Sequence, residues 1–302
     1  MSFALVFSGQ GNQYGQMLTW LEDDELLLSL QEQLKVRDWR AAMDDPAWTR
    51  DNRNAQVLIT ATALSAWRQI AEDLPEPVGV AGYSVGELAA YCAAGVVDPK
   101  QAIALASARA RLMNEAGGEV PAGLVAVTGL RRDDVARLLS GTPLHVAIVN
   151  GNDRVVVGGP AAALDELEAA MASRGARCTR IAVTVASHTP CMAQAADEFA
   201  SLLEGVRLNP PSFPLFSNVA DRVWSSEAAR KALSQQICRT VRWDECMDQL
   251  ALRAPRCVLE VGGGQALAQL WNQRHDGIPA RSCDEFKTKS GLLAWLSRQL
   301  QA

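Results

Sequence analysis

The chain has 302 residues, of which 48% are hydrophobic and 21% are charged, and its net charge is −5. This composition is typical of an ordinary globular protein and leaves room for one large domain or for a domain with an insertion. The acidic balance gives no reason to expect nucleic acid as a partner, and no apolar run is long enough to span a membrane. We expect no signal peptide, and the seven scattered cysteines indicate reduced thiols in the cytoplasm. The three histidines lack metal-ligand spacing, so no metal site is expected.

The first part of the chain predicts alternating strands and helices. A short buried strand begins at residue 3 and runs into a glycine-rich loop that reaches residue 13. A helix over 55–74, a short apolar strand over 78–82 and a helix over 87–97 follow. Asp98 and Pro99 are an N-cap and first-turn pair, and they begin a helix that should end near Gly117.

The middle of the chain follows a different order. Its patterns predict a strand over 123–130, a helix over 132–140, strands over 144–151 and 154–160, a helix over 162–175 and a strand over 177–185. The order β-α-β-β-α-β is that of the ferredoxin-like unit. We therefore expect residues 121–185 to form a ferredoxin-like small subdomain, inserted into an α/β core made of residues 1–120 and 186–302.

The second core segment resumes the α/β pattern. It predicts a strand over 213–218, a helix over about 226–238, a strand that runs into glycines over 256–264, and a helix over 265–273. The fold class expected from the whole chain is α/β.

Ser84 lies in Gly82-Tyr83-Ser84-Val85-Gly86, between a short strand and a helix. G-x-S-x-G in this context is typical of a nucleophile elbow, where a sharp turn lifts the serine hydroxyl clear of the sheet. The amide of Val85 then lies at a helix N-terminus and can donate to a developing oxyanion. The alternative is a serine that caps the helix, with Glu87 at capping-box spacing.

A nucleophilic serine needs a base, and His188 is the best placed of the three histidines. It follows a predicted strand end, where catalytic residues collect in α/β folds, whereas His145 lies within a strand and His275 in a polar segment. No acidic residue between Ser84 and His188 is placed at a strand end. We therefore expect a Ser–His dyad oriented by a main-chain carbonyl rather than a hydrolase triad.

The glycine loops also have nucleotide-binding interpretations. Gly9, Gly11 and Gly15 are spaced G-x-G-x-x-x-G, which departs from the Rossmann pattern. The glycines at 262–264 could cradle a phosphate at a helix start, but tight packing of strand against helix explains them as well.

Arg109 lies in the middle of the apolar arc of its helix, whereas Arg111 lies on the opposite, solvated side. An arginine on a buried face must be paired. An internal salt bridge or a snorkelling side chain explains it structurally. A receptor for a substrate carboxylate, which uses the guanidinium fork, explains it functionally.

Seven runs in the sequence together resemble the malonyl-CoA:acyl-carrier-protein transacylase family. They are "FSGQGNQ", "GYSVGELAA", "SARARLMNEA", "VASHTPCM", "SNV", "VRW" and "EVGGGQAL", in the family's order and over nearly the whole chain. The resemblance implies an α/β-hydrolase-like core with a ferredoxin-like insert. It also implies an enzyme with no permanently bound cofactor, which takes a CoA thioester as substrate and the prosthetic thiol of an acyl carrier protein as acceptor.

The resemblance assigns a role to each matching residue. Ser84 would be acylated and His188 would be the base, with the amides of Gln10 and Val85 as the oxyanion hole. Arg109 would hold the malonyl carboxylate. Gln56 and Tyr83 would line the pocket, and the main-chain carbonyl of Arg239 would orient His188.

The chain departs from the family pattern at three positions. Tyr83 stands where the family commonly has histidine, Ser8 where it has proline, and Asn12 where it has serine. At these positions the chain resembles the acyltransferase (epsilon) subunit of malonate decarboxylase. The resemblance then implies the other subunits of malonate decarboxylase as further partners. The alternatives are a transacylase of fatty-acid or polyketide synthesis, a serine hydrolase or thioesterase, and a non-catalytic protein that docks a carrier.

Overall fold

The computed structural model describes residues 2–301, and its core is a parallel five-stranded sheet. The strands are β1 (Phe3–Phe7), β2 (Gly79–Gly82), β7 (Leu215–Phe216), β9 (Cys257–Val261) and β10 (Ala280–Ser282). Their order in the sheet is β10-β9-β1-β2-β7, with parallel pairing throughout. Because β1 is central, the loop that follows it and the turn that follows β2 end side by side at one edge of the sheet.

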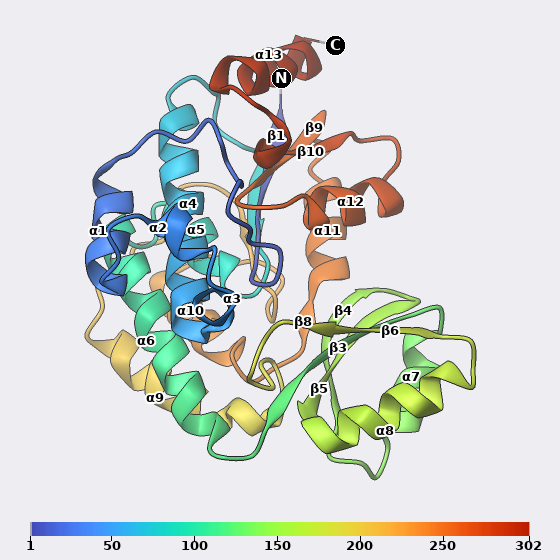
Figure 1. Cartoon of the computed structure of the whole chain (residues 1–302). Helices are drawn as coiled ribbons and strands as arrows, with labels where there is room; N and C mark the ends of the chain where they lie inside the picture. The colour runs from blue at the N-terminus through green and yellow to red at the C-terminus, as the bar shows by residue number, and fades with distance from the viewer. Residues whose placement is uncertain (1, 302) are drawn as a thin grey trace.

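Helices cover both faces of this sheet, as the alternation along β1 requires (Figure 1). Phe3, Leu5 and Phe7 point to the larger hydrophobic cluster, whereas Ala4 and Val6 point to the other face. The larger cluster takes buried residues from α1 (Glu25–Leu34), α4 (Asn52–Ala71), α5 (Gly86–Ala93), α6 (Pro99–Gly117), α9 (Ala193–Glu204), α10 (Ser226–Gln235) and α13 (Lys289–Gln301). The opposite face packs against α11 (Trp243–Ala251) and α12 (Ala266–Arg274). Two short helices, α2 (Trp39–Ala42) and α3 (Pro46–Arg50), lie between α1 and α4 in the chain.

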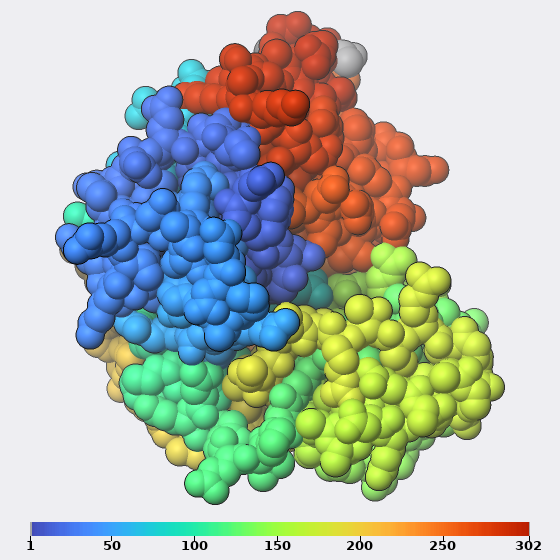
Figure 2. Space-filling model, viewed as in Figure 1, coloured from blue at the N-terminus to red at the C-terminus, as the bar shows by residue number. Residues whose placement is uncertain are grey.

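A second sheet forms the small lobe in green and yellow in Figures 1 and 2. Its elements in chain order are β3 (Ala122–Thr128), α7 (Arg132–Leu139), β4 (His145–Gly151), β5 (Arg154–Pro160), α8 (Ala161–Ala172) and β6 (Arg177–Ile181). The strands lie in the order β6-β3-β5-β4 with antiparallel pairing. The predicted β-α-β-β-α-β order and its ferredoxin-like arrangement are confirmed.

The small sheet also takes a strand from the core segment that follows it. β8 (Val241–Arg242) pairs in parallel with β4 at the edge of the small sheet and leads directly into α11. Leu124, Ile148 and Val156 of the small sheet belong to the same hydrophobic cluster as Trp243 of α11. The division into 1–120 with 186–302 and 121–185 stays a prediction, since β8 joins the two parts.

Several predicted elements end earlier in the structure, and three of them show why or by how much. The helix expected over 87–97 ends at Ala93, because Gly95 has a φ of 76° and the amide of Val96 donates back to the carbonyl of Tyr91 at 2.9 Å. The strand expected over 177–185 ends at Ile181, and Val185 is instead buried in the larger core cluster. The helix expected to reach about 238 ends at Gln235. No helix among residues 2–301 is long and apolar enough to cross a membrane.

Candidate active site

The turn between β2 and α5 carries Ser84 in a left-handed conformation, with a φ of 56°. The two flanking glycines are required by close backbone contacts. A Cβ on Gly82 would lie 2.2 Å from the carbonyl carbon of Gly86, and a Cβ on Gly86 would lie 2.4 Å from the carbonyl oxygen of Phe7. The sharp strand–turn–helix geometry expected of a nucleophile elbow is therefore present.

The hydroxyl of Ser84 pairs with His188 and does not cap α5. Ser84 Oγ lies 2.7 Å from His188 Nε2. Val85 occupies the N-cap position of α5, and no side chain caps that end. The two residues come from turns that are 104 positions apart, and His188 also has a left-handed backbone, with a φ of 64°. The structure thus brings together the predicted nucleophile and base, and the helix-capping alternative does not hold.

The other nitrogen of His188 faces a main-chain carbonyl, as expected, but not that of Arg239. Nδ1 lies 2.6 Å from the carbonyl oxygen of Gln236. The assignment to Arg239 is wrong by three positions, because α10 ends at Gln235 and leaves the Gln236 carbonyl pointing away from the helix. The amide of His188 also donates to the carbonyl of Ile237 at 2.8 Å, which sets this register.

This carbonyl determines which tautomer His188 adopts. A carbonyl oxygen only accepts, so Nδ1 carries the proton and Nε2 is left to accept the proton of Ser84. Burial and, to a lesser extent, the positive charge of Arg109 lower the pKa of His188, whereas the hydrogen bond to Gln236 raises it. With all three causes the pKa is about 3. The imidazole is therefore neutral at neutral pH, which is the state that a general base requires.

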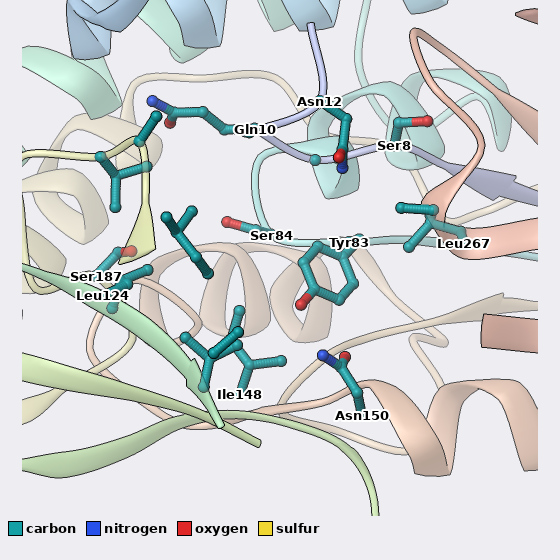
Figure 3. A pocket seen from close by; sticks show the side chains of 18 of the residues that line it. Ser8, Gln10, Asn12, Tyr83, Ser84, Leu124, Ile148, Asn150, Ser187 and Leu267 are labelled. Carbon is teal, nitrogen blue, oxygen red and sulfur yellow. The ribbon is translucent and has the colours of Figure 1, made fainter. Parts of the chain in front are cut away.

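The predicted oxyanion donors lie on both sides of the serine. Val85 follows Ser84 at the start of α5, and Gln10 lies in the loop after β1, beside the same cavity (Figure 3). Within residues 2–301, no acceptor lies at hydrogen-bonding distance from the main-chain amide of either residue. Both amides are thus available to a ligand, and their role stays a prediction.

Arg109 is 1% exposed on α6, and its hydrogen-bond partners are neutral amides. Nη1 donates to Gln56 Oε1 at 2.6 Å, and Nη2 donates to Gln236 Oε1 at 3.1 Å. Nε has no partner among the described residues. Burial lowers the pKa of Arg109 to about 10, although the nearby Glu87 carboxyl raises it. Neither structural explanation fits, because the side chain does not reach solvent and forms no salt bridge among residues 2–301.

Two residues without a predicted role connect these groups. The side chain of Gln236 accepts from Arg109 and donates from Nε2 to the carbonyl of Ser84 at 3.0 Å. Asn218 Oδ1 accepts from the amide of Ser84 at 2.9 Å, and Nδ2 donates to the carbonyl of Gly82 at 2.7 Å. The position of Asn218 two residues after β7 could have indicated it, since strand ends at this edge carry the site. Nothing in the local sequence marks Gln236.

The buried carboxyl of Glu87 accepts a hydrogen bond from the main chain of Asn218. Glu87 is fully buried on α5, and its Oε1 accepts from the amide of Asn218 at 2.5 Å. Burial raises the pKa of Glu87 to about 8, although the hydrogen bond from Asn218 and the charge of Arg109 lower it. The predicted capping box with Ser84 is absent, because the Glu87 side chain is used here instead.

A cavity of about 380 Å³ opens onto Ser84 and His188 between the core and the small sheet. In Figure 3, Ser8, Gln10 and Asn12 lie on one side and Leu124, Ile148 and Asn150 on the other, with Ser84 and Tyr83 between them. The ring of Tyr83 packs edge-on against Trp243, and burial raises the pKa of Tyr83 to about 12, so its hydroxyl stays neutral. Arg109 and Gln56 contact each other, and neither lines this cavity, so the prediction that Gln56 lines the pocket is wrong: its side chain is held by Arg109. Residues 2–301 contain no cluster of side chains that could hold a metal ion.

Comparisons with known proteins agree with this geometry. The profile of the family described as "Acyl transferase domain" matches residues 4–277. The malonyl CoA-acyl carrier protein transacylase of Mycobacterium tuberculosis strain H37Rv is 33% identical over 288 residues, which cover 92% of this chain and 95% of the relative. That of Haemophilus influenzae is 30% identical over 279 residues, which cover 88% and 89%.

Solved structures extend the likeness to the whole fold. A malonyl-transacylase in complex with a type II polyketide synthase acyl-carrier protein has a TM-score of 0.90 at 29% identity, with 99% of this chain and 100% of that chain covered. The malonyl transacylase structure from Mycobacterium tuberculosis has a TM-score of 0.86 at 30% identity, with 97% and 100% covered. The paired serine and histidine, the two-sheet fold and these matches lead to one conclusion: the chain belongs to the acyl transferase domain family and is an acyltransferase.

Proposed function

We propose that this chain transfers a malonyl group from malonyl-CoA to the prosthetic thiol of an acyl carrier protein, through an acyl-enzyme on Ser84. The observation that carries the proposal is the contact of 2.7 Å between Ser84 Oγ and His188 Nε2, beside a fully buried arginine whose partners are neutral. The names of the relatives support the same chemistry.

The first half-reaction forms the acyl-enzyme. Ser84 Oγ attacks the thioester carbonyl while His188 Nε2 takes its proton, and negative charge develops on the carbonyl oxygen. The amides of Gln10 and Val85 stabilise that oxygen. The carbon–sulfur bond then breaks, and the imidazolium returns the proton to the leaving CoA thiolate.

The second half-reaction repeats these steps with a different nucleophile. A carrier thiol gives its proton to His188 and attacks the malonyl ester, and Ser84 leaves with the proton from the imidazolium. The carbonyl of Gln236 accepts from Nδ1–H throughout and stabilises the imidazolium in each half-reaction. No acidic residue takes part.

Arg109 supplies the preference for a dicarboxylic acyl group. A buried guanidinium with a partnerless Nε and only neutral partners retains its full charge for an incoming anion. In the acyl-enzyme, the malonyl carboxylate takes the place of Gln56 and Gln236 as the partner of Arg109.

The setting that we propose is malonate decarboxylase, with its carrier subunit as the acceptor. Tyr83, Ser8 and Asn12 support it, because all three line the cavity and all three depart from the usual family pattern. The alternative setting is fatty-acid or polyketide synthesis, which the names of the relatives and the complex with a polyketide carrier favour.

Labelled malonyl-CoA tests the activity and the setting together. We expect one malonyl group on the protein, stable until a carrier with a free prosthetic thiol is added, and faster transfer to a malonate decarboxylase carrier than to a fatty-acid carrier. Rapid release of free malonate would indicate a hydrolase, and no adduct would indicate a non-catalytic docking protein. Faster transfer to the fatty-acid carrier would assign the chain to biosynthesis.

A further inference from the structure

Ser8 lies where three segments meet: the loop after β1 and the elbow, which carry the candidate oxyanion donors, and the loop after β9. It directly follows β1 and begins the loop that carries Gln10. It is 3% exposed, and its neighbours approach it closely. A Cβ on Gly86 of the elbow would lie 2.6 Å from the carbonyl oxygen of Ser8. A Cβ on Gly262, after β9, would lie 2.8 Å from the Cβ of Ser8. Any shift of Ser8 is therefore transmitted to the loop and to the elbow.

Two hydrogen bonds tie Ser8 to the end of β9. Its amide donates to the carbonyl of Val261 at 3.1 Å, and its hydroxyl donates to Glu260 Oε1 at 2.8 Å. Glu260 is 1% exposed, and its second oxygen accepts from the amide of Ala268 in the first turn of α12 at 2.8 Å. The Glu260 carboxyl thus links the loop after β1 to the N-terminus of α12.

The glycines of residues 262–264 let the two loops approach. Gly262 and Gly264 have φ values of 132° and 81°, which side chains rarely adopt. A Cβ on Gly264 would lie 2.9 Å from Asn12 Cβ, and a Cβ on Gly263 would lie 2.4 Å from Met17 Sδ. The run "EVGGG" therefore packs against the loop 8–17 at several points along its length. The hydrogen bond from Ser8 to Glu260 holds the start of that loop.

We infer that the hydrogen bond between Ser8 and Glu260 is a positioning contact for acyl transfer, which holds the loop 8–12 so that the Gln10 amide stays beside Ser84. Neither side chain is required to touch the reacting atoms. The inference rests on the proposed function, because it gives a role to the oxyanion donor of that reaction. An oxyanion is bound only as the transition state forms, so loosening the loop slows acylation without weakening substrate binding.

Single-turnover acylation by malonyl-CoA tests this inference. The rate constant of Ser84 acylation and the Kd of malonyl-CoA are measured by rapid quench and intact mass for the wild type, Ser8→Ala, Glu260→Ala and the double variant. We expect Ser8→Ala to lower the rate constant about ten-fold, less than the loss of a whole oxyanion donor, with Kd within about two-fold. The double variant should lose no more than the worse single variant, because both remove the same contact.

Ser65→Ala is the matched control. Ser65 is fully buried on α4, donates to Asp24 Oδ2 at 2.8 Å and accepts from Gln69 Nε2 at 3.2 Å. Ser65→Ala therefore also removes a bond from a buried serine to a carboxylate, on a helix that does not line the cavity. We expect it to lower the melting temperature about as much as Ser8→Ala does and to leave acylation unchanged. A Ser8→Ala enzyme that acylates like Ser65→Ala, or losses that multiply in the double variant, would overturn the inference. If the wild type itself is not acylated, the proposed function fails, which is a separate result.

Discussion

Ser84 and His188 both hold backbone conformations that L-residues adopt at a cost, with φ values of 56° and 64°. A non-glycine residue in this region costs about 1–2 kcal/mol. Leu18, Lys35 and Ala254 also have positive φ values, but Ser84 and His188 are the two whose side chains meet, at 2.7 Å. Part of the backbone strain of the described residues therefore lies at the candidate reacting pair.

The first prediction separates this strain from the chemistry. Ser84→Ala should give no malonyl adduct by intact mass, and so should Ser84→Gly, because neither variant has a nucleophile. Ser84→Gly should unfold at higher urea than Ser84→Ala, by up to about 1 kcal/mol in the free energy of unfolding, since glycine tolerates the positive φ. A normal adduct on either variant would rule out Ser84 as the nucleophile.

The second prediction concerns Arg109 and the acyl group. Arg109→Ala leaves the malonyl carboxylate buried without a partner, which costs about 2–5 kcal/mol. Malonyl transfer should therefore fall by roughly 30- to 4000-fold. Acetyl transfer should fall far less, because acetyl-CoA has no second carboxylate. The ratio of the two rates is the quantity to measure.

Arg111→Ala is the control for Arg109. Arg111 is exposed on the same helix and pairs with Glu115 at 2.8 Å, so its loss should change neither rate. Equal losses of malonyl and acetyl transfer in Arg109→Ala would mean that Arg109 supports the fold and does not receive the carboxylate.

The third prediction uses the pH dependence of the base. The charge of Arg109 is the second cause, after burial, of the low pKa of His188. Arg109→Gln removes that charge, so the pKa of His188 should rise from about 3 and stay below its usual 6.5, because the burial is unchanged. The acidic limb of kcat/KM for acetyl transfer should then move to higher pH. An unmoved limb would show that the two groups are not coupled.

At the scale of elements, the elbow is held by a neighbour on the edge of the sheet. β7 is only two residues long, and the side chain of Asn218 continues its pairing by bonding to the Ser84 amide and the Gly82 carbonyl. The side-chain amide of Asn218 thus makes the kind of hydrogen bonds that a strand backbone would make, at the point where the backbone leaves β2. The two bonds tie both sides of the turn to the segment after β7.

The fourth prediction tests this side-chain clamp. Asn218→Ala leaves a buried donor and a buried acceptor unpaired, at about 1–3 kcal/mol for each group. We expect a loss of about 2 kcal/mol or more in urea unfolding and a lower acylation rate. Asn209→Ala is the control, because Asn209 is exposed and bonds to the Gly95 carbonyl at 3.4 Å. A variant as stable as this control would show that the clamp contributes nothing.

At the scale of the whole molecule, buried titratable groups make stability depend on pH. Burial raises the pKa of Glu87 to about 8 and that of Glu260 to about 7, so the folded protein holds protons that the unfolded chain releases near 4.5. Stability from these carboxyls is complete below about 4.5 and is lost as the pH rises through their folded values. The lowered pKa of His188 acts in the opposite direction, and its effect is complete above 6.5.

The fifth prediction follows from these opposite signs. Between about pH 6.5 and 8, the pKa shift of His188 no longer changes the stability, and both Glu87 and Glu260 lose their protons in the folded protein. The free energy of unfolding should therefore fall, with Glu87 contributing the larger part, about 2 kcal/mol. Urea unfolding at several pH values in this range measures the decline. Glu87→Gln should reduce the decline to the smaller part that Glu260 contributes, since the amide does not titrate. The same decline in the variant would assign the effect to another group.

Sequence patterns were sufficient for the elements whose cause is local. The ferredoxin-like order follows from alternating strand and helix periods with short connections, and the elbow follows from Gly82 and Gly86 around Ser84. Even here the observed ends of elements differ from the predicted ones. The left-handed conformation of Gly95, for example, ends α5 before the apolar run is over. Helices such as α9 and α11 were not predicted, although both are amphipathic and pack on the core.

By itself, the sequence determined the α/β fold class, and it predicted the pairing of Ser84 with His188, a main-chain carbonyl at the other nitrogen of His188 and the burial of Arg109. Only the tertiary structure decided which groups hold them: the carbonyl of Gln236 instead of Arg239, the clamp by Asn218, and the bond from Ser8 to Glu260. Their partners are 48, 134 and 252 positions apart in the chain. A local pattern records which face of a helix is buried, but contacts at such separations depend on how strands and helices pack in three dimensions, where a shift of one helical turn exchanges one carbonyl for another.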